Sequence, residues 1–278
     1  MSGPAPNHLP LRELLQRHNL HLKKSLGQNF LHDAGALERI VRAADVAPDD
    51  TVLEIGPGVG SLTQHLAYNA RRVIAVEIDE RLRPLLTETL NAYPNVTLVF
   101  GDILDQPIST LIGDGPYKVV ANVPYYITSA ILRHLLESQR PPTCLVLTVQ
   151  REVAERIVAA PGDLSLLAVS VQYYGQPRLL HKIGAGAFFP RPEVDSAVLR
   201  VDVHPQPLAP DVPPRTFFRV VQAGFRQKRK QLKNALVSGL GRPAAHIDTA
   251  LAAAGVDGRR RAETLTIDEW LGLARAMG

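Results

Sequence analysis

The chain has 278 residues, 45% of them hydrophobic, which suffices for one large domain and a small one, while its net charge of +4 does not alone indicate a polyanion-binding protein. No segment approaches the roughly 18 apolar residues of a membrane helix, and no apolar signal-peptide region follows Met1, so we expect a cytoplasmic protein. The one cysteine, Cys144, lies in an apolar run, which predicts a small buried side chain and no disulfide or metal site.

The first 22 residues are expected to form a loose arm with one short helix near 11–17. Strand-like and helix-like segments then alternate along the chain. The alternation predicts βαβ units and a mostly parallel, doubly wound sheet. The expected strands are 51–55, 72–78, 96–100, 118–122 and 144–149, and the expected helices are 36–44, 62–68, 81–92 and 129–138.

Two more helices are expected at 152–159 and 166–174, followed by an edge hairpin of 178–183 and 197–203. Five prolines between 205 and 214 predict a linker, and everything beyond it has a helical pattern. Thr266 and Glu269 have the spacing of a capping box before the last helix. We therefore expect an arm at 1–22, an α/β domain at 23–204 and a small helical domain at 205–278.

The helical domain contains a segment of one charge sign. Eight basic residues and no carboxylate lie between 212 and 247: Arg215, Arg219, Arg226, Lys228, Arg229, Lys230, Lys233 and Arg242. A solvated helix face is the simple interpretation of such a run. Like charges in one segment repel one another, and a polyanion that lies against them offsets this repulsion. The segment therefore favours contact with nucleic acid.

A glycine-rich loop joins the strand 51–55 to the next helix, with the form Gly56-x-Gly58-x-Gly60. Such a loop lets a ligand approach the backbone and directs a helix N-terminus toward it. By itself the loop fits a nicotinamide or flavin cofactor about as well as S-adenosylmethionine. Its third glycine comes one residue earlier than in the dinucleotide fingerprint, and methyltransferases, which bind no pyrophosphate, commonly have this spacing.

Carboxylates follow at the ends of the next two expected strands, Glu77 and Asp102. Glu77 is suited to accept hydrogen bonds from both hydroxyls of a ribose, and Asp102 from an adenine amino group. Each could instead cap a turn or be a solvated charge. Three successive strand ends with complementary groups nevertheless indicate a nucleoside pocket.

The fourth strand runs into Asn122-Val123-Pro124-Tyr125, which resembles the Asn/Asp-Pro-Pro-aromatic motif of methyltransferases that act on ring-conjugated amino groups. The lone pair of adenine N6 is delocalised. It could be localised if the Asn122 amide oxygen and the Val123 carbonyl oxygen accepted hydrogen bonds from the two N–H groups of N6. Pro124 fixes the backbone there, and Tyr125 offers a stacking face for an extruded base. The simpler alternative is an Asn-Pro turn in which Tyr125 merely packs.

From Lys23 onward the sequence resembles the ribosomal RNA adenine N6,N6-dimethyltransferase family, and specifically its bacterial small-subunit (16S) members. The blocks 27–31, 188–198 and 225–236 carry the resemblance together with the motifs above. It implies a Rossmann-like class I methyltransferase sheet with an antiparallel edge hairpin, and S-adenosylmethionine as cofactor. Two positions depart from the usual pattern: Tyr126 stands in place of Asn, and Val123 in place of Leu.

The resemblance also implies roles for individual residues. Asn122 is the expected methyl-transfer residue, acting with Pro124 and Tyr125, and Phe188 is expected to provide a second stacking surface opposite Tyr125. The residues implied at the cofactor are Asn29, Leu31, Gly56, Gly58, Glu77, Asp102 and Asn122.

For the substrate, the resemblance implies dimethylation of two adjacent adenosines in the 3′-terminal hairpin of 16S ribosomal RNA during assembly of the small subunit. The expected RNA contacts are Arg226, Lys228, Arg229, Lys230 and Lys233, because phosphate contacts position an RNA while the pocket selects the base. We expect a monomer without a membrane partner.

Three alternatives remain open from the sequence. A related enzyme that dimethylates large-subunit (23S) RNA and confers antibiotic resistance would share the pocket. A nicotinamide-dependent oxidoreductase would share the glycine loop, and an assembly factor would bind RNA without catalysis.

Overall fold

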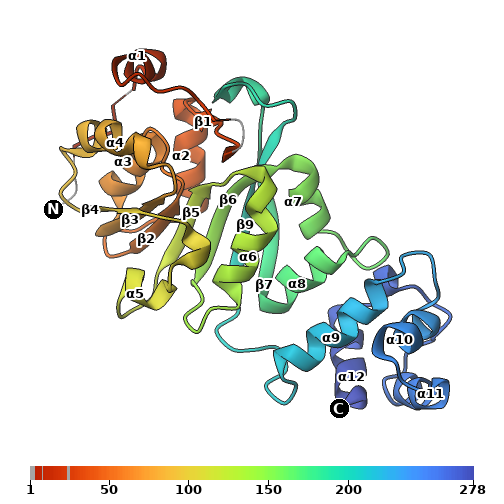
Figure 1. The fold of residues 1–278 in the computed structure, drawn as a ribbon. Coiled ribbons are helices and arrows are strands. Elements are labelled where there is room, and N and C mark those ends of the chain that lie inside the picture. The colour runs from red at the N-terminus through yellow and green to blue at the C-terminus, as the bar shows by residue number, and fades with distance from the viewer. Residues whose placement is uncertain (1–3, 8, 24–25) are drawn as a thin grey trace. The chain divides into compact units, whose positions relative to one another are not determined.

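The computed structural model describes residues 4–7, 9–23 and 26–278, so residues 1–3 and 8 of the expected arm, and positions 24 and 25 after it, lie outside the described residues. The described chain forms two compact units (Figure 1). The first comprises the chain up to Ala154 together with Arg178–Val203, and the second comprises Glu155–Pro177 and His204–Gly278.

The first unit is built on a seven-stranded sheet of order β4-β3-β2-β5-β6-β9-β7. Its strands are β2 (Thr51–Ile55), β3 (Arg72–Glu77), β4 (Val96–Phe100), β5 (Lys118–Asn122), β6 (Cys144–Gln150), β7 (Gly175–Ile183) and β9 (Ser196–Val203). The pairs β2/β3, β3/β4, β2/β5 and β5/β6 are parallel, and β9 runs antiparallel to β6. The predicted mostly parallel sheet is confirmed, with β7 at its edge beside β9.

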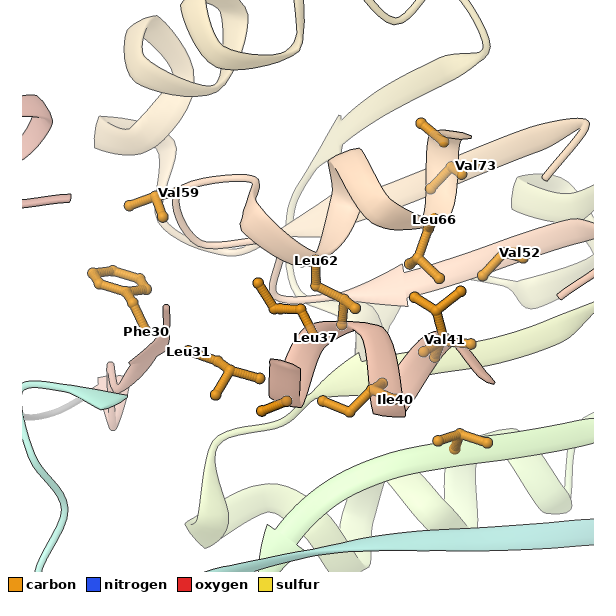
Figure 2. Packing of buried hydrophobic residues seen from close by; sticks show 14 of the residues in the cluster. Phe30, Leu31, Leu37, Ile40, Val41, Val52, Val59, Leu62, Leu66 and Val73 are labelled. Carbon is orange, nitrogen blue, oxygen red and sulfur yellow. The ribbon is translucent and has the colours of Figure 1, made fainter. Parts of the chain in front are cut away.

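Helices cover both faces of this sheet (Figure 1). They are α2 (Ala34–Ala43), α3 (Ser61–Asn69), α4 (Arg83–Leu90), α5 (Ile108–Ile112) and α6 (Thr128–Leu136), and α7 (Arg151–Ile157) follows β6. The sequence did not predict α5, whose five residues are too few to show a helical period. Leu37 and Val41 of α2 and Leu62 and Leu66 of α3 belong to one apolar cluster with Val52 of β2 (Figure 2).

The central strands are buried on both sides because helices cover both faces, so they contain near-continuous apolar residues. Cys144, at the start of β6, is only 4% exposed. Its burial raises the pKa of the thiol to about 11. The prediction of a buried cysteine is confirmed.

The N-terminal segment differs from the loose arm that we expected. Its helix α1 (Leu11–Arg17) is present, but Leu11, Leu14 and Leu15 are buried in the same core as α2 and α3. Burial of three leucines on one helix face stabilises the segment against the domain. Further on, β1 (Phe30–Leu31) pairs antiparallel with β8 (Phe188–Phe189) in a second, two-stranded sheet.

The second unit is helical and has a core of its own. It contains α8 (Leu166–Tyr174), α9 (Pro214–Phe225), α10 (Leu232–Leu240), α11 (Ala244–Ala253) and α12 (Ile267–Met277). The predicted capping box of Thr266 and Glu269 is present at the start of α12. No helix among the described residues is long and apolar enough to span a lipid bilayer.

The structure corrects the expected boundary at 204/205 for one segment. Residues Glu155–Pro177, which we assigned to the α/β domain, belong to the second unit. The physical reason is aromatic packing: the Tyr173 ring of α8 stacks on Phe217 of α9 with centroids 4.4 Å apart, and both side chains are almost fully buried.

Candidate nucleoside site

The carboxyl ends of β2, β3, β4 and β5 meet at one cavity in the first unit. It lies where the strand order reverses between β2 and β5, the usual ligand position in an open α/β sheet. Eight of the ten predicted catalytic and cofactor residues line it: Asn29, Gly56, Gly58, Glu77, Asp102, Asn122, Pro124 and Tyr125. The parallel sheet thus brings together residues spread over almost a hundred positions.

The glycine loop after β2 has a backbone that only glycine adopts readily. Gly56, Gly58 and Gly60 have φ values of +70°, +61° and +91°. A Cβ atom at Gly58 would lie 2.6 Å from Cδ1 of Phe30. The missing side chains therefore allow both the turn and the close approach of the β1 segment over it.

Glu77 connects the end of β3 to this loop. Its carboxylate accepts hydrogen bonds from the backbone N–H of Gly58 at 3.1 Å and of Asp79 at 2.9 Å, one on each oxygen. The side chain is only 4% exposed. Burial raises the pKa of Glu77, and the two backbone N–H donors act in the opposite direction. Each oxygen keeps a further lone pair, so the carboxylate can still accept from a ligand hydroxyl.

Asp102 caps a turn and also lies at the cavity. Its Oδ1 accepts from the backbone N–H of Leu104 at 2.9 Å and caps a 3₁₀ turn, η3 (Ile103–Asp105). The residue also lines the cavity. An apolar residue follows each carboxylate, Ile78 after Glu77 and Ile103 after Asp102, and both line the same cavity. Two such side chains suit a flat aromatic ring, and the sequence analysis did not single them out.

Asn122, at the end of β5, has a defined amide orientation. Its Nδ2 donates a hydrogen bond to the carbonyl oxygen of Asn29 at 3.0 Å. The donor side of the amide is therefore engaged by the protein, and the oxygen is left for a donor in the cavity. Val123 also lines the cavity and holds the next backbone carbonyl.

Two consecutive tyrosines follow in the 3₁₀ turn η4 (Tyr125–Ile127). The Tyr125 hydroxyl hydrogen-bonds Ser196 Oγ of β9 at 2.7 Å, which holds its ring in place, and burial raises the pKa of that hydroxyl. Tyr126 also lines the cavity but is 62% exposed. A Cβ atom at Gly27 would lie 3.3 Å from the Tyr126 ring, so the two residues are in close contact.

An ion pair that the sequence analysis missed fixes the segment before β1. Asp79 forms two short hydrogen bonds with the Arg81 guanidinium and accepts a third, from Gln28 Nε2 at 2.9 Å. The hydrogen bonds from Arg81 are the main reason that the pKa of Asp79 is lowered. Arg81 also donates to the carbonyl of His21 at 3.1 Å. A signal was visible in the sequence, since Asp79 stands two residues after Glu77.

Leu31 and Phe188 are not among the residues that line the cavity. They lie opposite each other in the β1/β8 ladder and are 4% and 3% exposed. Both side chains belong to the hydrophobic core of the first unit. A cofactor contact for Leu31 and a stacking role for Phe188 opposite Tyr125 therefore stay predictions.

In the second unit, four of the five predicted RNA contacts lie in the turn between α9 and α10. Arg226, Lys228, Arg229 and Lys230 are exposed, and no carboxylate among the described residues forms an ion pair with them. Lys233 differs, because its ammonium lies 2.8 Å from the carboxylate of Asp248. Asp248 stands one residue beyond the carboxylate-free segment 212–247, and the RNA contact of Lys233 stays a prediction.

Comparison with known proteins gives one family. The profile described as "Ribosomal RNA adenine dimethylase" matches residues 19–277. Among curated proteins, "Ribosomal RNA small subunit methyltransferase A" of Moorella thermoacetica is 48% identical over 275 residues, which cover 95% of each chain. The protein of the same name from Dehalococcoides mccartyi (strain CBDB1) is 46% identical over 260 residues, 93% of this chain and 89% of the relative.

Two solved structures resemble most of the chain. A dimethyladenosine transferase from Plasmodium falciparum has a TM-score of 0.77 and 25% identity, and covers 88% of this chain and 95% of its own. The 23S rRNA methyltransferase ErmE has a TM-score of 0.70 and 31% identity, and covers 90% and 99%. The expected class I methyltransferase fold is confirmed by these neighbours.

Proposed function

The chain belongs to the ribosomal RNA adenine dimethylase family, and from that premise we propose that it transfers methyl groups from S-adenosylmethionine to N6 of adenosine in small-subunit ribosomal RNA. We further propose the 16S substrate that the sequence suggested: two adjacent adenosines of the 3′-terminal hairpin, dimethylated during subunit assembly. The observation that carries the proposal is the Asn122 amide, whose donor side is held by Asn29 at 3.0 Å.

The cavity residues fit the cofactor. Glu77 has acceptor capacity for ribose hydroxyls, and Asp102 lies at the next strand end for an adenine amino group. The backbone at Gly56, where a Cβ would meet nothing closer than 3.9 Å, is open to the methionine part. When bound, S-adenosylmethionine supplies an electrophilic methyl group on a sulfonium centre. The protein residues then have to present the nucleophile in line with that group and exclude water.

Adenine N6 is a weak nucleophile because its lone pair is shared with the ring. The Asn122 side-chain oxygen and the Val123 carbonyl oxygen can accept hydrogen bonds from the two N–H groups of N6. These hydrogen bonds favour a nitrogen whose lone pair is localised. Pro124, with φ −58°, fixes the backbone between them. The anchored ring of Tyr125 provides the stacking surface for a base taken out of its strand. A strong general base is unnecessary, since the methylated ammonium can release its proton to water.

We propose that the exposed cations between α9 and α10 bind the RNA backbone. Arg226, Lys228, Arg229 and Lys230 are available for phosphate contacts, whereas Lys233 would first have to leave Asp248. The substrate would be ribosomal RNA within an assembling small subunit, and the enzyme a cytoplasmic monomer.

The main competing function is dimethylation of large-subunit RNA, because ErmE shares the fold. The small-subunit assignment is favoured by the relatives of that name at 46% and 48% identity, against 31% for ErmE. An assembly factor without catalysis is disfavoured by the placement of Asn122, Pro124 and Tyr125 in one cavity. A nicotinamide-dependent oxidoreductase has no support from the family match.

Mass spectrometry of ribosomal RNA fragments tests the proposal. We expect dimethyladenosine at adjacent positions of the terminal 16S hairpin in cells with the gene, and its loss after deletion. Complementation with the Asn122→Ala variant should not restore the modification, whereas the wild-type gene should. Modified adenosine in 23S RNA, with an unmodified 16S hairpin, would reject the assignment.

A further inference from the structure

A second aromatic and cationic surface lies on the first unit, outside the cavity. The Arg12 guanidinium of α1 lies over the Phe189 ring of β8, 4.9 Å from its centroid. Two depressions flank this pair, and both are lined by Arg12 and Phe189. His32 lines one depression, and His21 the other. None of these four side chains lines the cavity of the nucleoside site.

This surface is connected to the cavity through the β1/β8 ladder. Phe189 lies opposite Phe30 in the β1/β8 ladder, and Phe30 lines the cavity beside Asn29. His32 donates its backbone N–H to the carbonyl of Ala187 at 3.0 Å, which extends the connection by one residue. The helix that carries Arg12 is anchored by its buried leucines. The surface is therefore joined to the cavity through the paired residues Phe189 and Phe30.

The charge of the N-terminal segment suits a strand of nucleic acid. Residues 9–31 contain four Lys or Arg and a single carboxylate, Glu13. Arg17 is already paired with Glu88, at 2.5 Å, and His18 contacts the same carboxylate. Arg12, by contrast, has no ion-pair partner among the described residues, although Glu13 lines one of the same depressions. Arg12 is thus a cation that is placed on an aromatic ring and remains available to a phosphate.

We propose that Arg12 and Phe189 form a binding site for a nucleotide that flanks the target adenosine in the RNA. The nucleotide binds with its phosphate at the Arg12 guanidinium and its base against the Phe189 ring, a combination that proteins use for single-stranded nucleic acid without strict sequence preference. The site holds the strand on the methyltransferase unit itself, beside the cavity. This inference rests on the proposed RNA substrate.

Two variants and a matched control test the site. Arg12→Gln removes the cation, and Phe189→Leu removes the aromatic face but keeps an apolar side chain. Arg17→Gln makes the same charge change on the same helix, at a residue already paired with Glu88. The measurements are the Kd for the terminal hairpin RNA at several salt concentrations, the Kd for S-adenosylmethionine, and the melting temperature of each variant.

We expect Arg12→Gln to weaken RNA binding about tenfold and to reduce the slope of log K against log salt by about 0.7 to 0.9. Phe189→Leu should weaken binding by a similar factor with an unchanged salt slope, because it removes stacking and not charge. Cofactor affinity should be unaltered in both, and Arg17→Gln should behave as wild type. If Arg12→Gln binds RNA like Arg17→Gln, the site is rejected.

The outcomes separate this inference from the proposed function. If the wild-type protein methylates the hairpin neither as free RNA nor in the subunit, both the proposed RNA substrate and the proposed flanking-nucleotide site are rejected. Methylation by wild type, with RNA affinity and salt slope unchanged in both test variants, would reject only the flanking-nucleotide site. Should Phe189→Leu fold poorly, the surface substitution Arg12→Gln still decides the question.

Discussion

The Nδ2 atom of Asn122 donates a hydrogen bond to the backbone carbonyl of Asn29 at 3.0 Å, across 93 positions of the sequence. The contact joins the end of the central strand β5 to the segment that precedes β1. That segment is itself held by the hydrogen bond between Gln28 and Asp79. The direction of the amide oxygen in the cavity therefore depends on a backbone group that no local motif around Asn122 specifies.

Replacing Asn122 by Asp should reduce turnover strongly, by about 10²-fold or more. A carboxylate cannot donate to the Asn29 carbonyl and would place a negative charge against it, so the side chain would turn from its present position. RNA and cofactor affinity should change much less, because the lost interaction matters most in the transition state. Single-turnover rates and equilibrium binding separate the two effects. A loss of RNA affinity equal to the loss in rate would contradict this role.

Glu77→Gln should weaken the binding of S-adenosylmethionine by about tenfold or more, since one carboxylate oxygen becomes an amide donor that faces the Gly58 N–H. In the wild-type protein, burial raises the pKa of Glu77 above its usual 4.5. When the pH is lowered, Glu77 should therefore become protonated at a higher pH than an ordinary carboxyl group does. Cofactor affinity should begin to fall at that higher pH. Calorimetry between pH 5 and 8 measures this. Glu80→Gln, at a more exposed carboxylate of the same turn, is the control; equal effects would remove the assignment.

Gly58→Ala should lower the free energy of unfolding by about 2–4 kcal/mol, from the cost of a left-handed conformation and of overpacking together. The new Cβ would lie 2.6 Å from the Phe30 ring. Gly241→Ala is the control, because Gly241 is also in a left-handed conformation (φ +62°, ψ 30°) but a Cβ there meets nothing within 4 Å. Urea denaturation of both variants separates the contact from the backbone strain. Similar losses in the two would show that Phe30 moves aside freely.

Glu54, on β2, is 1% exposed, and its Oε2 has no hydrogen-bond partner among the described residues. Burial raises the pKa of this carboxyl to about 8. The unfolded chain releases the proton near the ordinary value of 4.5, so between these two values the unfolded state binds fewer protons and stability falls as the pH rises. The contribution of protonated Glu54 to the free energy of unfolding is therefore fully present below pH 4.5 and is lost as the pH rises toward 8.

Glu54→Gln should therefore be more stable than wild type at pH 8 by about 3–4 kcal/mol, and much closer to it at pH 5. Denaturant melts of the cofactor-free protein at the two pH values provide the measurement. The exposed Glu80→Gln should alter neither value. A wild-type stability that rises between pH 5 and pH 8 in parallel with that of Glu54→Gln would argue against a neutral buried carboxyl group.

Substituting Lys228, Arg229 and Lys230 together by Gln should weaken RNA binding and reduce its salt slope by about two. Cofactor affinity should be unaffected, since these residues belong to the second unit. Arg275→Gln offers a control in that unit, because Arg275 is already paired with Asp211. An unchanged salt slope in the triple variant would count against phosphate contacts in this turn.

Much of the cavity could be predicted because its residues stand at successive strand ends. In a parallel sheet those ends meet at one edge, so Gly56, Glu77, Asp102 and Asn122 could be placed together from their positions after apolar runs. The contact of Asn122 with Asn29 could not be predicted in the same way. Residues 23–31 show no period, and nothing local relates them to β5.

The errors outside the cavity have a common physical cause. Helix α1 could be predicted as a helix, but the sequence does not reveal which core receives its leucines, and the same is true of α8. The β1/β8 ladder places Phe188 in the core, which its residue type does not reveal, and its stacking role stays a prediction. Patterns along the chain indicate which face is apolar, whereas the partner of that face is decided by tertiary packing.

The buried thiol of Cys144 has a practical use in the laboratory. A thiol with a pKa near 11 and almost no exposure holds very little thiolate at neutral pH, so maleimide reagents should leave it unmodified. Because it is the sole cysteine in the chain, a second one introduced at an exposed position such as Gln222 would take up a fluorescent dye selectively. Native protein could then be labelled at a chosen point and used to follow RNA docking in real time, without first deleting any natural side chain.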